Sequence, residues 1–326
     1  MFKNLPKINH SCSCDEIFRM VHSVTAKWNI DNISRTNAYF YFFQRYPEIE
    51  WTFLASMVSR NAGYNMCDLE GELLRDTLSP LYRKYLFLTY ERANFLIFKD
   101  VFPQLLLYHY STILNKKMFH FLPLFFVSSF MVNEWECFWE NRNRKRLMTS
   151  LIVNEQNVIQ KPVIEEPFFQ REVFHSRLFL LQDFLKMNSV VFPTVNGELY
   201  GMPVHQFTKL DARIKLGKAL AEILFYPMIY NQFYQFASMT EHTGSRMDYE
   251  QYFLPRKSRE TPFLRTVYPI VNHPNQVFKS WDHSRSVKKK WFVPEKKPEN
   301  IQIKKMYELK RKQLKQFSYV YRLMKG

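Results

Sequence analysis

Two short polar segments hold the residue types that bind ligands or catalyse reactions, in a chain otherwise rich in apolar side chains. The first polar segment is Ser-Arg-Asn-Ala-Gly-Tyr-Asn at 59–65, and the second is His-Thr-Gly-Ser-Arg-Met-Asp-Tyr at 242–249. We expect each to lie where a helix ends, because such a turn exposes backbone N–H groups and directs an arginine toward an anion. The predicted ligand-binding residues are Arg60, Asn61, Asn65, Arg246 and Tyr249.

The second polar segment also contains a candidate catalytic set. His242 has the chemistry of a general base that Asp248 would orient, and Ser245 has that of a nucleophile. These roles require separations of about 3 Å between the reacting side chains. In the competing interpretation, Ser245 and Asp248 cap helices while Arg246 pairs with a buried carboxylate, as in polar networks that specify a fold without catalysis. We favour this structural interpretation, and whether the protein is an enzyme stays open.

Glycine usage argues against several cofactor-binding folds. The chain of 326 residues has only 7 glycines, and none of them stands in a GxGxxG, GxxxxGKS/T or GxSxG pattern. Rossmann and P-loop folds place several glycines in one phosphate-binding turn. The sequence therefore predicts no cofactor, and its low glycine content favours helices over a turn-rich β fold.

The cysteines and histidines do not follow a known metal-binding pattern. His10, Cys12 and Cys14 are separated by single residues, whereas structural zinc sites separate paired cysteines by two or more, and no second pair follows. No apolar signal segment precedes them. We therefore predict no metal site, four free thiols and a cytoplasmic location.

The elements that must position these residues are predicted to be mostly α-helical. We expect a compact multi-helix body over 15–278, preceded by an N-terminal arm over 1–14. A small β-hairpin or irregular insertion is expected near 189–204, because Asn196-Gly197 suits a tight turn between two short apolar runs. The high aromatic content, 17%, with 31 Phe and 19 Tyr, predicts a core packed with rings.

The predicted positions of the two polar segments at helix ends depend on several predicted helix boundaries. Gly63 is expected as the left-handed cap that ends a helix over 48–61. One long helix is predicted over 210–237 with a kink at Pro227, and another over 168–187. Further helices are predicted over 15–28 with Asp15 as cap, from Asp31 or Ser34 to Tyr46, and over 68–78, 79–99 and 149–160.

Two uncharged runs, 101–115 and 118–133, are the only stretches that resemble membrane spans. Each is shorter than the roughly 20 residues that a spanning helix needs, and a proline interrupts each of them. We therefore predict buried core helices and no transmembrane segment. His109 and His120 lie in these runs and are expected to be core histidines bonded to backbone groups.

Positive charge is concentrated at the end of the chain. The net charge is +16, of which residues 279–326 carry +11, with 15 Lys and Arg against 4 Asp and Glu. We call 279–326 the basic tail and divide it into a linker over 279–300 and an amphipathic helix over 301–326. The predicted apolar face of that helix, with spacings of three and four, is Met306, Leu309, Gln313, Phe317, Val320 and Met324.

Three interpretations of the basic tail remain open. The helix can pack on the body with solvated lysines, lie on an anionic membrane surface, or bind nucleic acid through phosphate contacts and base stacking. Packing on the body is the simplest of the three, because apolar helical faces usually pack. The residues predicted to bind a polyanion are Lys288, Lys289, Lys290, Trp291, Lys310, Arg311 and Lys312.

Several motifs match one family in order along the chain. They are SRT at 34–36, PEIEW at 47–51, MVSRNAGYNM at 57–66, PQLLLY at 103–108, LYG at 199–201 and the second polar segment. In these motifs the sequence resembles a domain-of-unknown-function family from Gram-positive, largely spore-forming bacteria. The resemblance covers most of 15–283 and not the basic tail. It implies a bacterial, cytoplasmic setting and supplies no activity, cofactor or catalytic residue.

Two functional hypotheses follow from these observations. In the first, the protein is a non-catalytic cytoplasmic binding protein whose basic, aromatic tail contacts an anionic polymer or a membrane surface, which would place it at the membrane periphery. In the second, it is an enzyme or small-molecule-binding protein whose two polar segments form one site for a polar or anionic ligand. The second hypothesis predicts that the two segments meet in one solvent-accessible pocket. The sequence names no particular small molecule.

Overall fold

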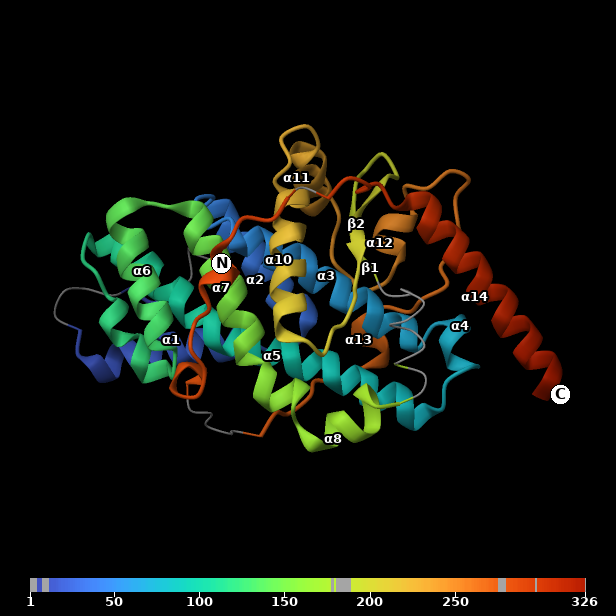
Figure 1. Cartoon of the computed structure of the whole chain (residues 1–326), viewed down its shortest axis with the longest axis horizontal. Helices are drawn as coiled ribbons and strands as arrows, with labels where there is room; N and C mark the ends of the chain where they lie inside the picture. Colours follow the sequence, from blue (N-terminus) through green and yellow to red (C-terminus); the bar gives the residue numbers. More distant parts are fainter. Residues whose placement is uncertain are drawn as a thin grey trace.

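The computed structural model describes residues 5–7, 12–176, 179, 189–274, 280–296 and 298–325. In the last helix, α14 (Lys304–Lys325), the described side chains are those of 304–316 and Ser318. These residues form a mostly α-helical fold with one two-stranded antiparallel sheet (Figure 1), which confirms the predicted fold class.

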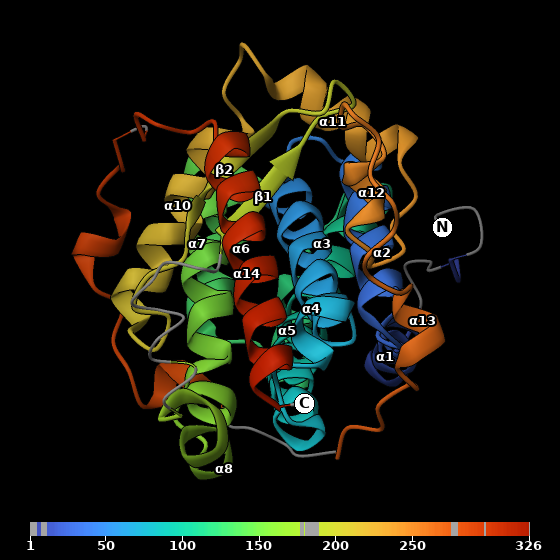
Figure 2. The same cartoon turned by 90° about the vertical axis from the view of Figure 1, so that its right-hand side faces the viewer.

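Two long helices cross the molecule and the others pack around them (Figure 1). Besides α14, the described helices are α1 (Cys14–Trp28), α2 (Asn32–Arg45), α3 (Trp51–Leu69), α4 (Glu72–Arg75), α5 (Pro80–Leu114), α6 (Ser129–Asn141), α7 (Arg144–Val158), α8 (Pro167–Phe169), α10 (Leu210–Leu224), α11 (Tyr230–Met239), α12 (Met247–Glu250) and α13 (Leu264–Val267). α5 runs along the longest axis and α3 lies beside it, while α14 lies near α4 at the end of the molecule opposite α6 (Figures 1 and 2).

Short turns of other helix types connect these elements. The 3-10 turns are η2 (Phe119–Phe125), η5 (Trp281–His283) and η6 (Lys289–Phe292), and the π-helical turns are η3 (Gln160–Ile164) and η4 (Gln170–Phe174). The predicted helix over 168–187 begins with α8 and η4. Apart from Phe179, its remainder from 177 onward lies outside the described residues.

Side-chain caps explain where several helices begin. Ser13 and Glu16 form a capping box at the start of α1, so the helix begins before Asp15, the residue predicted as its cap. Asp31 accepts a bond from the backbone N–H of Ser34 and caps α2, as predicted. α3 begins at Trp51 rather than at 48, in the first turn after Pro47.

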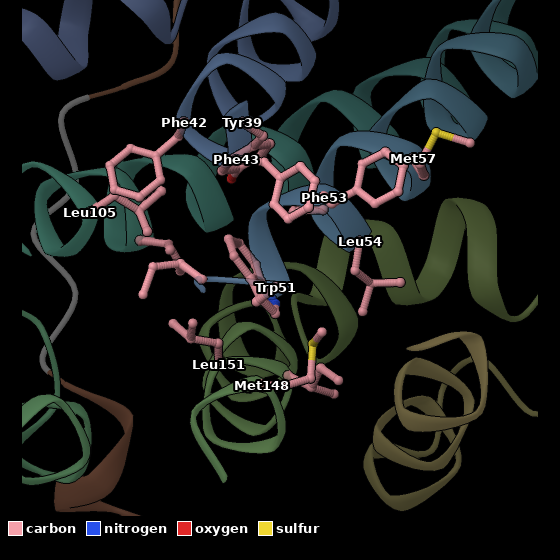
Figure 3. Close-up of a cluster of buried hydrophobic side chains, with 14 of the residues drawn as sticks. Tyr39, Phe42, Phe43, Trp51, Phe53, Leu54, Met57, Leu105, Met148 and Leu151 are labelled. Carbon is pink, nitrogen blue, oxygen red and sulfur yellow. The ribbon is translucent and has the colours of Figure 1, made fainter. Parts of the chain in front are cut away.

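Aromatic side chains fill the centre of the molecule, between α2, α3, α5 and α7 (Figure 3). Tyr39 packs edge-on against Trp51, with ring centroids 5.4 Å apart, and Phe43 stacks on Phe53 at 4.9 Å. Such geometries add attraction beyond the area that the rings bury. Trp51 and Phe53, both fully buried, fix the first turn of α3 against α2.

The predicted end of a helix at Gly63 is wrong. α3 continues to Leu69, and Gly63 lies inside it. A Cβ atom at this position would lie 2.5 Å from Asn32 Oδ1 and 2.8 Å from His242 Nε2. Glycine is therefore needed for the close approach of α2 and the second polar segment to α3, not for a left-handed turn. The first polar segment is helical throughout.

Two prolines act differently from the prediction. α5 continues through Pro103 to Leu114, so the predicted helix over 79–99 and the uncharged run after it form a single helix. In contrast, the predicted long helix over 210–237 divides into α10 and α11 around Pro227. Proline lacks the N–H that an α-helix bonds and disfavours helical geometry at the residue before it, which explains the break in the second case.

The two histidines that were expected in the core lie in different surroundings. His109 is buried as predicted, and its Nδ1 lies 2.7 Å from the Tyr46 hydroxyl, so one of its partners is a side chain. His120 is exposed, and the prediction that it lies in the core is wrong, because η2 is a turn at the surface rather than a buried helix. None of the described helices combines the length and the low charge that a bilayer-spanning segment requires.

The predicted hairpin is present and joins the body to the basic tail. β1 (Ser189–Pro193) pairs antiparallel with β2 (Leu199–Pro203), with Val191 opposite Gly201. The Gly201 N–H then donates to the Ile301 carbonyl at 2.8 Å, and the Ile303 N–H donates to the Leu199 carbonyl at 2.8 Å. These two backbone bonds fix the segment that leads into α14 along the open edge of β2.

Candidate functional site

The candidate catalytic residues of the second polar segment form a buried network. His242 Nδ1 lies 3.2 Å from Asp248 Oδ2, and His242 Nε2 lies 2.8 Å from Asn32 Oδ1. Burial lowers the pKa of His242, and the adjacent Asp248 partly offsets this effect. The Ser245 hydroxyl bonds the carbonyl and hydroxyl oxygens of Thr261, both at 2.9 Å. The ring nitrogen of His242 that a general base would use already has a protein partner. Ser245 bonds Thr261 and not His242.

Arg246 and Tyr249 join this network to the tail helix. Arg246 Nε lies 2.5 and 2.7 Å from the two carboxylate oxygens of Asp68, at the end of α3. The Tyr249 hydroxyl donates to the Tyr307 hydroxyl at 3.2 Å, and Arg311 lies 3.8 Å from Asp68. Arg246 thus has the carboxylate partner that the structural interpretation of the second polar segment expects.

The two polar segments do meet, through packing rather than around a ligand. Arg60 donates to the carbonyls of Ala237 and Thr240 at 3.3 and 3.0 Å, at the C-terminal end of α11, where a helix attracts cations. Asn61 forms a two-bond pair with the backbone of Val191: Nδ2 donates at 2.6 Å, and Oδ1 accepts at 2.7 Å. Neither cavity described below is lined by Arg60 or by any residue of the second polar segment.

A cavity of about 220 Å³ lies between α3, α5, α7, α10 and β1. Its walls are mainly apolar and its polar groups are few, as in pockets that bind small molecules. Two predicted ligand-binding residues, Asn61 and Asn65, belong to the lining. The polar lining residues are Tyr39, Ser59, Asn61, Asn65, Thr89, Tyr90, Asn94, Glu155, Gln156 and Arg213. The aromatic and larger aliphatic lining residues include Leu54, Val58, Leu86, Ile97, Ile159, Phe174, Phe179, Phe207, Leu216 and Leu220.

Glu155 is the acidic residue of this cavity. Its Oε2 accepts a bond from Trp51 Nε1 at 3.1 Å, and its Oε1 accepts one from Gln156 Nε2 at 3.0 Å. Both donors are neutral, and within the described part of the chain this carboxylate forms no ion pair. Burial raises the pKa of Glu155 to about 7, although the two bonds act in the opposite direction. Sequence reasoning missed this residue, because Asn-Glu-Gln in a helix has no distinctive pattern.

Arg213 is the basic residue of the cavity, and its guanidinium donates to neutral acceptors. Its guanidinium donates to Gln156 Oε1 at 2.9 Å, to the Phe207 carbonyl at 2.8 Å, to the Gln156 carbonyl at 3.2 Å and to Gln160 Oε1. Burial, reinforced by the charge of Arg285, lowers the pKa of Arg213 to about 10. Gln156 therefore bridges Glu155 and Arg213, and keeps the two charges apart.

Tyr39 supplies a polar atom without a partner. Its side chain is 4% exposed and lines the cavity. Within the described ranges, no hydrogen-bond partner is in reach of its hydroxyl. A buried hydroxyl left unbonded costs about 1–3 kcal/mol, so a polar group in the cavity would relieve a cost that this structure carries.

A second cavity, of about 430 Å³, lies between α2, α5 and the segment around α13. Its volume is larger, but its charged groups already have partners. Asp31 accepts from Arg265 at 2.7 Å, and Glu91 accepts from Arg35 at 2.6 Å. We therefore regard the first cavity as the candidate functional site, because only its lining contains both an uncompensated carboxyl and an unbonded hydroxyl among the described residues.

Of the predicted polyanion-binding residues of the linker, Trp291 is buried against the body, while the three lysines are exposed. Trp291 is 3% exposed, and its Nε1 donates to Asp211 Oδ1 at 2.7 Å, so its ring is not available for stacking on a base in this structure. Lys288 lies 3.8 Å from Asp211, and Lys290 lies 2.5 Å from it. Lys289 is exposed.

In the described part of α14 the buried face matches the predicted one only in part, since Met306 packs against the core. Tyr307 is 9% exposed, whereas Leu309 of the predicted apolar face is 57% exposed. Arg311 pairs with Glu260 at 2.6 Å, and Lys312 is exposed; Lys310 is partly buried. The side chains of Phe317, Val320 and Met324 lie outside the described residues. The first turns of the tail helix thus pack on the body through 303, 307 and 311.

Across the described ranges, no group of His, Cys, Asp or Glu is arranged to hold a metal ion. His10, the first residue of the spacing considered for zinc, lies outside those ranges.

With this geometry in place, the chain can be assigned to a family. A family model described as "Protein of unknown function (DUF2515)" matches residues 27–313, and the chain belongs to this family. It is 46% identical to the "Uncharacterized protein YppC" of Bacillus subtilis (strain 168) over 300 residues, which are 92% of this chain and 93% of the relative. The match reaches residue 313, so it includes most of the basic tail, where we had expected the resemblance to end. No solved structure matches the chain.

Proposed function

We propose that the protein is a non-catalytic, cytoplasmic binding protein whose cavity between α3, α5, α7 and α10 holds a small, largely apolar ligand. The observation that carries this proposal is the lining of the cavity, which is apolar except for a few polar groups that converge on it. The candidate catalytic residues give no support to a reaction at His242, because its two ring nitrogens and the Ser245 hydroxyl all have protein partners.

Titration with 1-octanol tests this proposal through thermal unfolding. A ligand that binds only the folded state stabilises it by about 2.7 kcal/mol at 100 times its Kd, which raises the melting temperature. In the variant Ala93→Leu an added side chain occupies the cavity and should remove the shift. The matched control is Ala26→Leu, at an exposed position of α1, which should keep it. An equal shift in both variants, or none in the wild type, would refute the proposal.

A second candidate function concerns the outward face of α14, for which we propose contact with an anionic membrane surface. Lys305 and Lys312 are exposed on either side of Leu309, which is 57% exposed. Basic residues around an exposed apolar side chain on a helix are typical of interfacial membrane binding. The burial of Trp291 weighs against base stacking and so against nucleic acid as the partner.

Co-sedimentation with phosphatidylserine vesicles tests this second proposal. Point substitutions are preferable to removing the tail, because Trp291, Ile303 and Tyr307 belong to the core. We expect Lys305→Gln/Lys312→Gln to lose most vesicle binding and the control Lys84→Gln/Lys215→Gln, at exposed positions of the body, to keep it. Binding to a single-stranded oligonucleotide but not to vesicles would overturn the membrane assignment.

A further inference from the structure

The charge that a ligand of the cavity should carry follows from the groups around Glu155. Its carboxylate belongs to the wall of the cavity and accepts bonds from two neutral donors, Trp51 Nε1 and Gln156 Nε2. A buried carboxylate is ordinarily paired with a cation, because burial without one is costly. The cavity beside Glu155 is where the missing cation would fit.

The neighbouring charges favour a cation at the same place. Burial is the main cause of the raised pKa of Tyr39; Glu155 and Asp100 raise it further, and Arg35 acts to lower it. Arg35 is already held by Glu91, with NH2 2.6 Å from Oε1. Glu155 and Asp100, which form no ion pair among the described residues, therefore act on the part of the cavity near Tyr39, where they disfavour an anion and favour a positive charge. Arg213, the cation of the lining, is bonded to Gln156, Gln160 and the Phe207 carbonyl.

Tyr39 provides a second recognition group. Its ring lies edge-on to Trp51 with centroids 5.4 Å apart (Figure 3). Trp51 in turn bonds Glu155, so Trp51 contacts both side chains. Its hydroxyl lines the cavity and has no partner among the described residues. An ammonium group has three N–H donors and no acceptor, so one ammonium can donate to both the Glu155 carboxylate and the Tyr39 oxygen.

We propose that the cavity takes a primary amine with an apolar body, whose ammonium group pairs with Glu155 and donates to Tyr39. This inference rests on the proposed ligand-binding function. Aromatic lining residues such as Tyr90 and Phe179 suit a cation, because ring faces attract positive charge. An apolar cavity of about 150 Å³ holds benzene, so about 220 Å³ holds by proportion roughly nine non-hydrogen atoms.

Isothermal titration calorimetry with octylamine, 1-octanol and octanoate at pH 8 tests the inference on the wild-type protein. These molecules share one apolar chain and differ in head group. We expect octylamine to bind at least about tenfold more tightly than 1-octanol, as a charge-assisted bond to a desolvated carboxylate implies. Octanoate should bind most weakly, because Glu155 repels it.

Two variants separate a direct role of Glu155 from a general effect of charge. In Glu155→Gln the amine preference should fall to about one, while 1-octanol still binds. The matched control is Asp100→Asn: Asp100 also has a pKa raised by burial to about 7 and accepts bonds from two side-chain amides, but it does not line the cavity. This control removes only a charge outside the lining and should keep most of the preference. Tyr39→Phe should reduce amine affinity more than alcohol affinity.

The outcomes distinguish the inference from the proposed function. If 1-octanol binds and octylamine binds no more tightly, the inference is overturned while the ligand-binding function stands. If octanoate binds most tightly, Arg213 and not Glu155 sets the specificity, and the inference is again overturned. If none of the three binds, both proposals fail. An amine preference that survives Glu155→Gln also overturns the assignment of this carboxylate.

Discussion

Replacement of Glu155 by glutamine should change how stability depends on pH. In the folded protein the pKa of Glu155 is raised by burial from 4.5 to about 7. Between these two pH values the unfolded chain has released its proton while the folded protein retains it, so unfolding becomes easier as the pH rises. At about 1.4 kcal/mol for each pH unit, the free energy of unfolding falls by up to roughly 3 kcal/mol over this range.

Glutamine keeps the shape of the side chain and cannot titrate there. The stability of Glu155→Gln relative to the wild type should therefore rise by up to roughly 3 kcal/mol between pH 5 and pH 8. Urea unfolding at both pH values, followed by tryptophan fluorescence, measures this difference directly. The variant also replaces one hydrogen-bond acceptor by a donor, and this constant cost cancels in the comparison. A difference that is the same at pH 5 and pH 8 would refute a raised pKa at this position.

Three further predictions concern the contacts that hold the fold. Gly63→Ala should destabilise the protein by roughly 2 kcal/mol or more, because its Cβ would lie 2.5 Å from a side-chain oxygen. In thermal unfolding, the control Gly71→Ala should destabilise the protein less, because the nearest atom to its Cβ would lie at 3.1 Å. Trp291→Ala should cost roughly 3–5 kcal/mol in urea unfolding, and an unchanged midpoint would show that the linker does not pack on the core. Arg246→Gln should lower the free energy of unfolding by roughly 3 kcal/mol, because Asp68 loses its main partner. The double variant with Asp68→Asn should lower it by clearly less than the sum of the two single variants. Strict additivity of the two losses would contradict the pairing.

Features with a local cause could be predicted from the sequence. The hairpin depends on Asn196-Gly197 between two apolar runs, and it forms where predicted, with Gly197 at φ +74°. The helix of the basic tail depends on its own periodicity and is also present. The start of α2 follows from the Asp31 side chain a few residues away.

Features decided by distant contacts could not be predicted in the same way. Gly63 resembles a cap in sequence, but its role depends on Asn32 and His242, which approach it from other parts of the chain. The buried face of α14 depends on Tyr249 and on the edge of β2, so its own apolar spacing places Leu309 on the buried face although it is exposed. The two polar segments are close in space, yet their side chains bond to other parts of the chain: Asn61 to Val191, and His242 to Asn32.

The cavity is the strongest example of a feature that sequence reasoning misses. Its lining combines one face each of α3 and α5 with residues of α2, α7 and α10, and no local pattern brings these helices together. Glu155 becomes distinctive only when Trp51, more than a hundred positions earlier, donates to it and the surrounding core removes water. Asn61 and Asn65 were selected for the turn that they were expected to form, and they line the cavity from a continuous helix instead.

The most direct test of the central claim is a crystal structure of the full chain with octylamine. The account predicts ligand density in the cavity between α3, α5, α7 and α10, with the amine nitrogen about 3 Å from a Glu155 carboxylate oxygen and within hydrogen-bond distance of the Tyr39 hydroxyl. A cavity filled by the protein's own side chains, or an amine bound only elsewhere on the molecule, would contradict it.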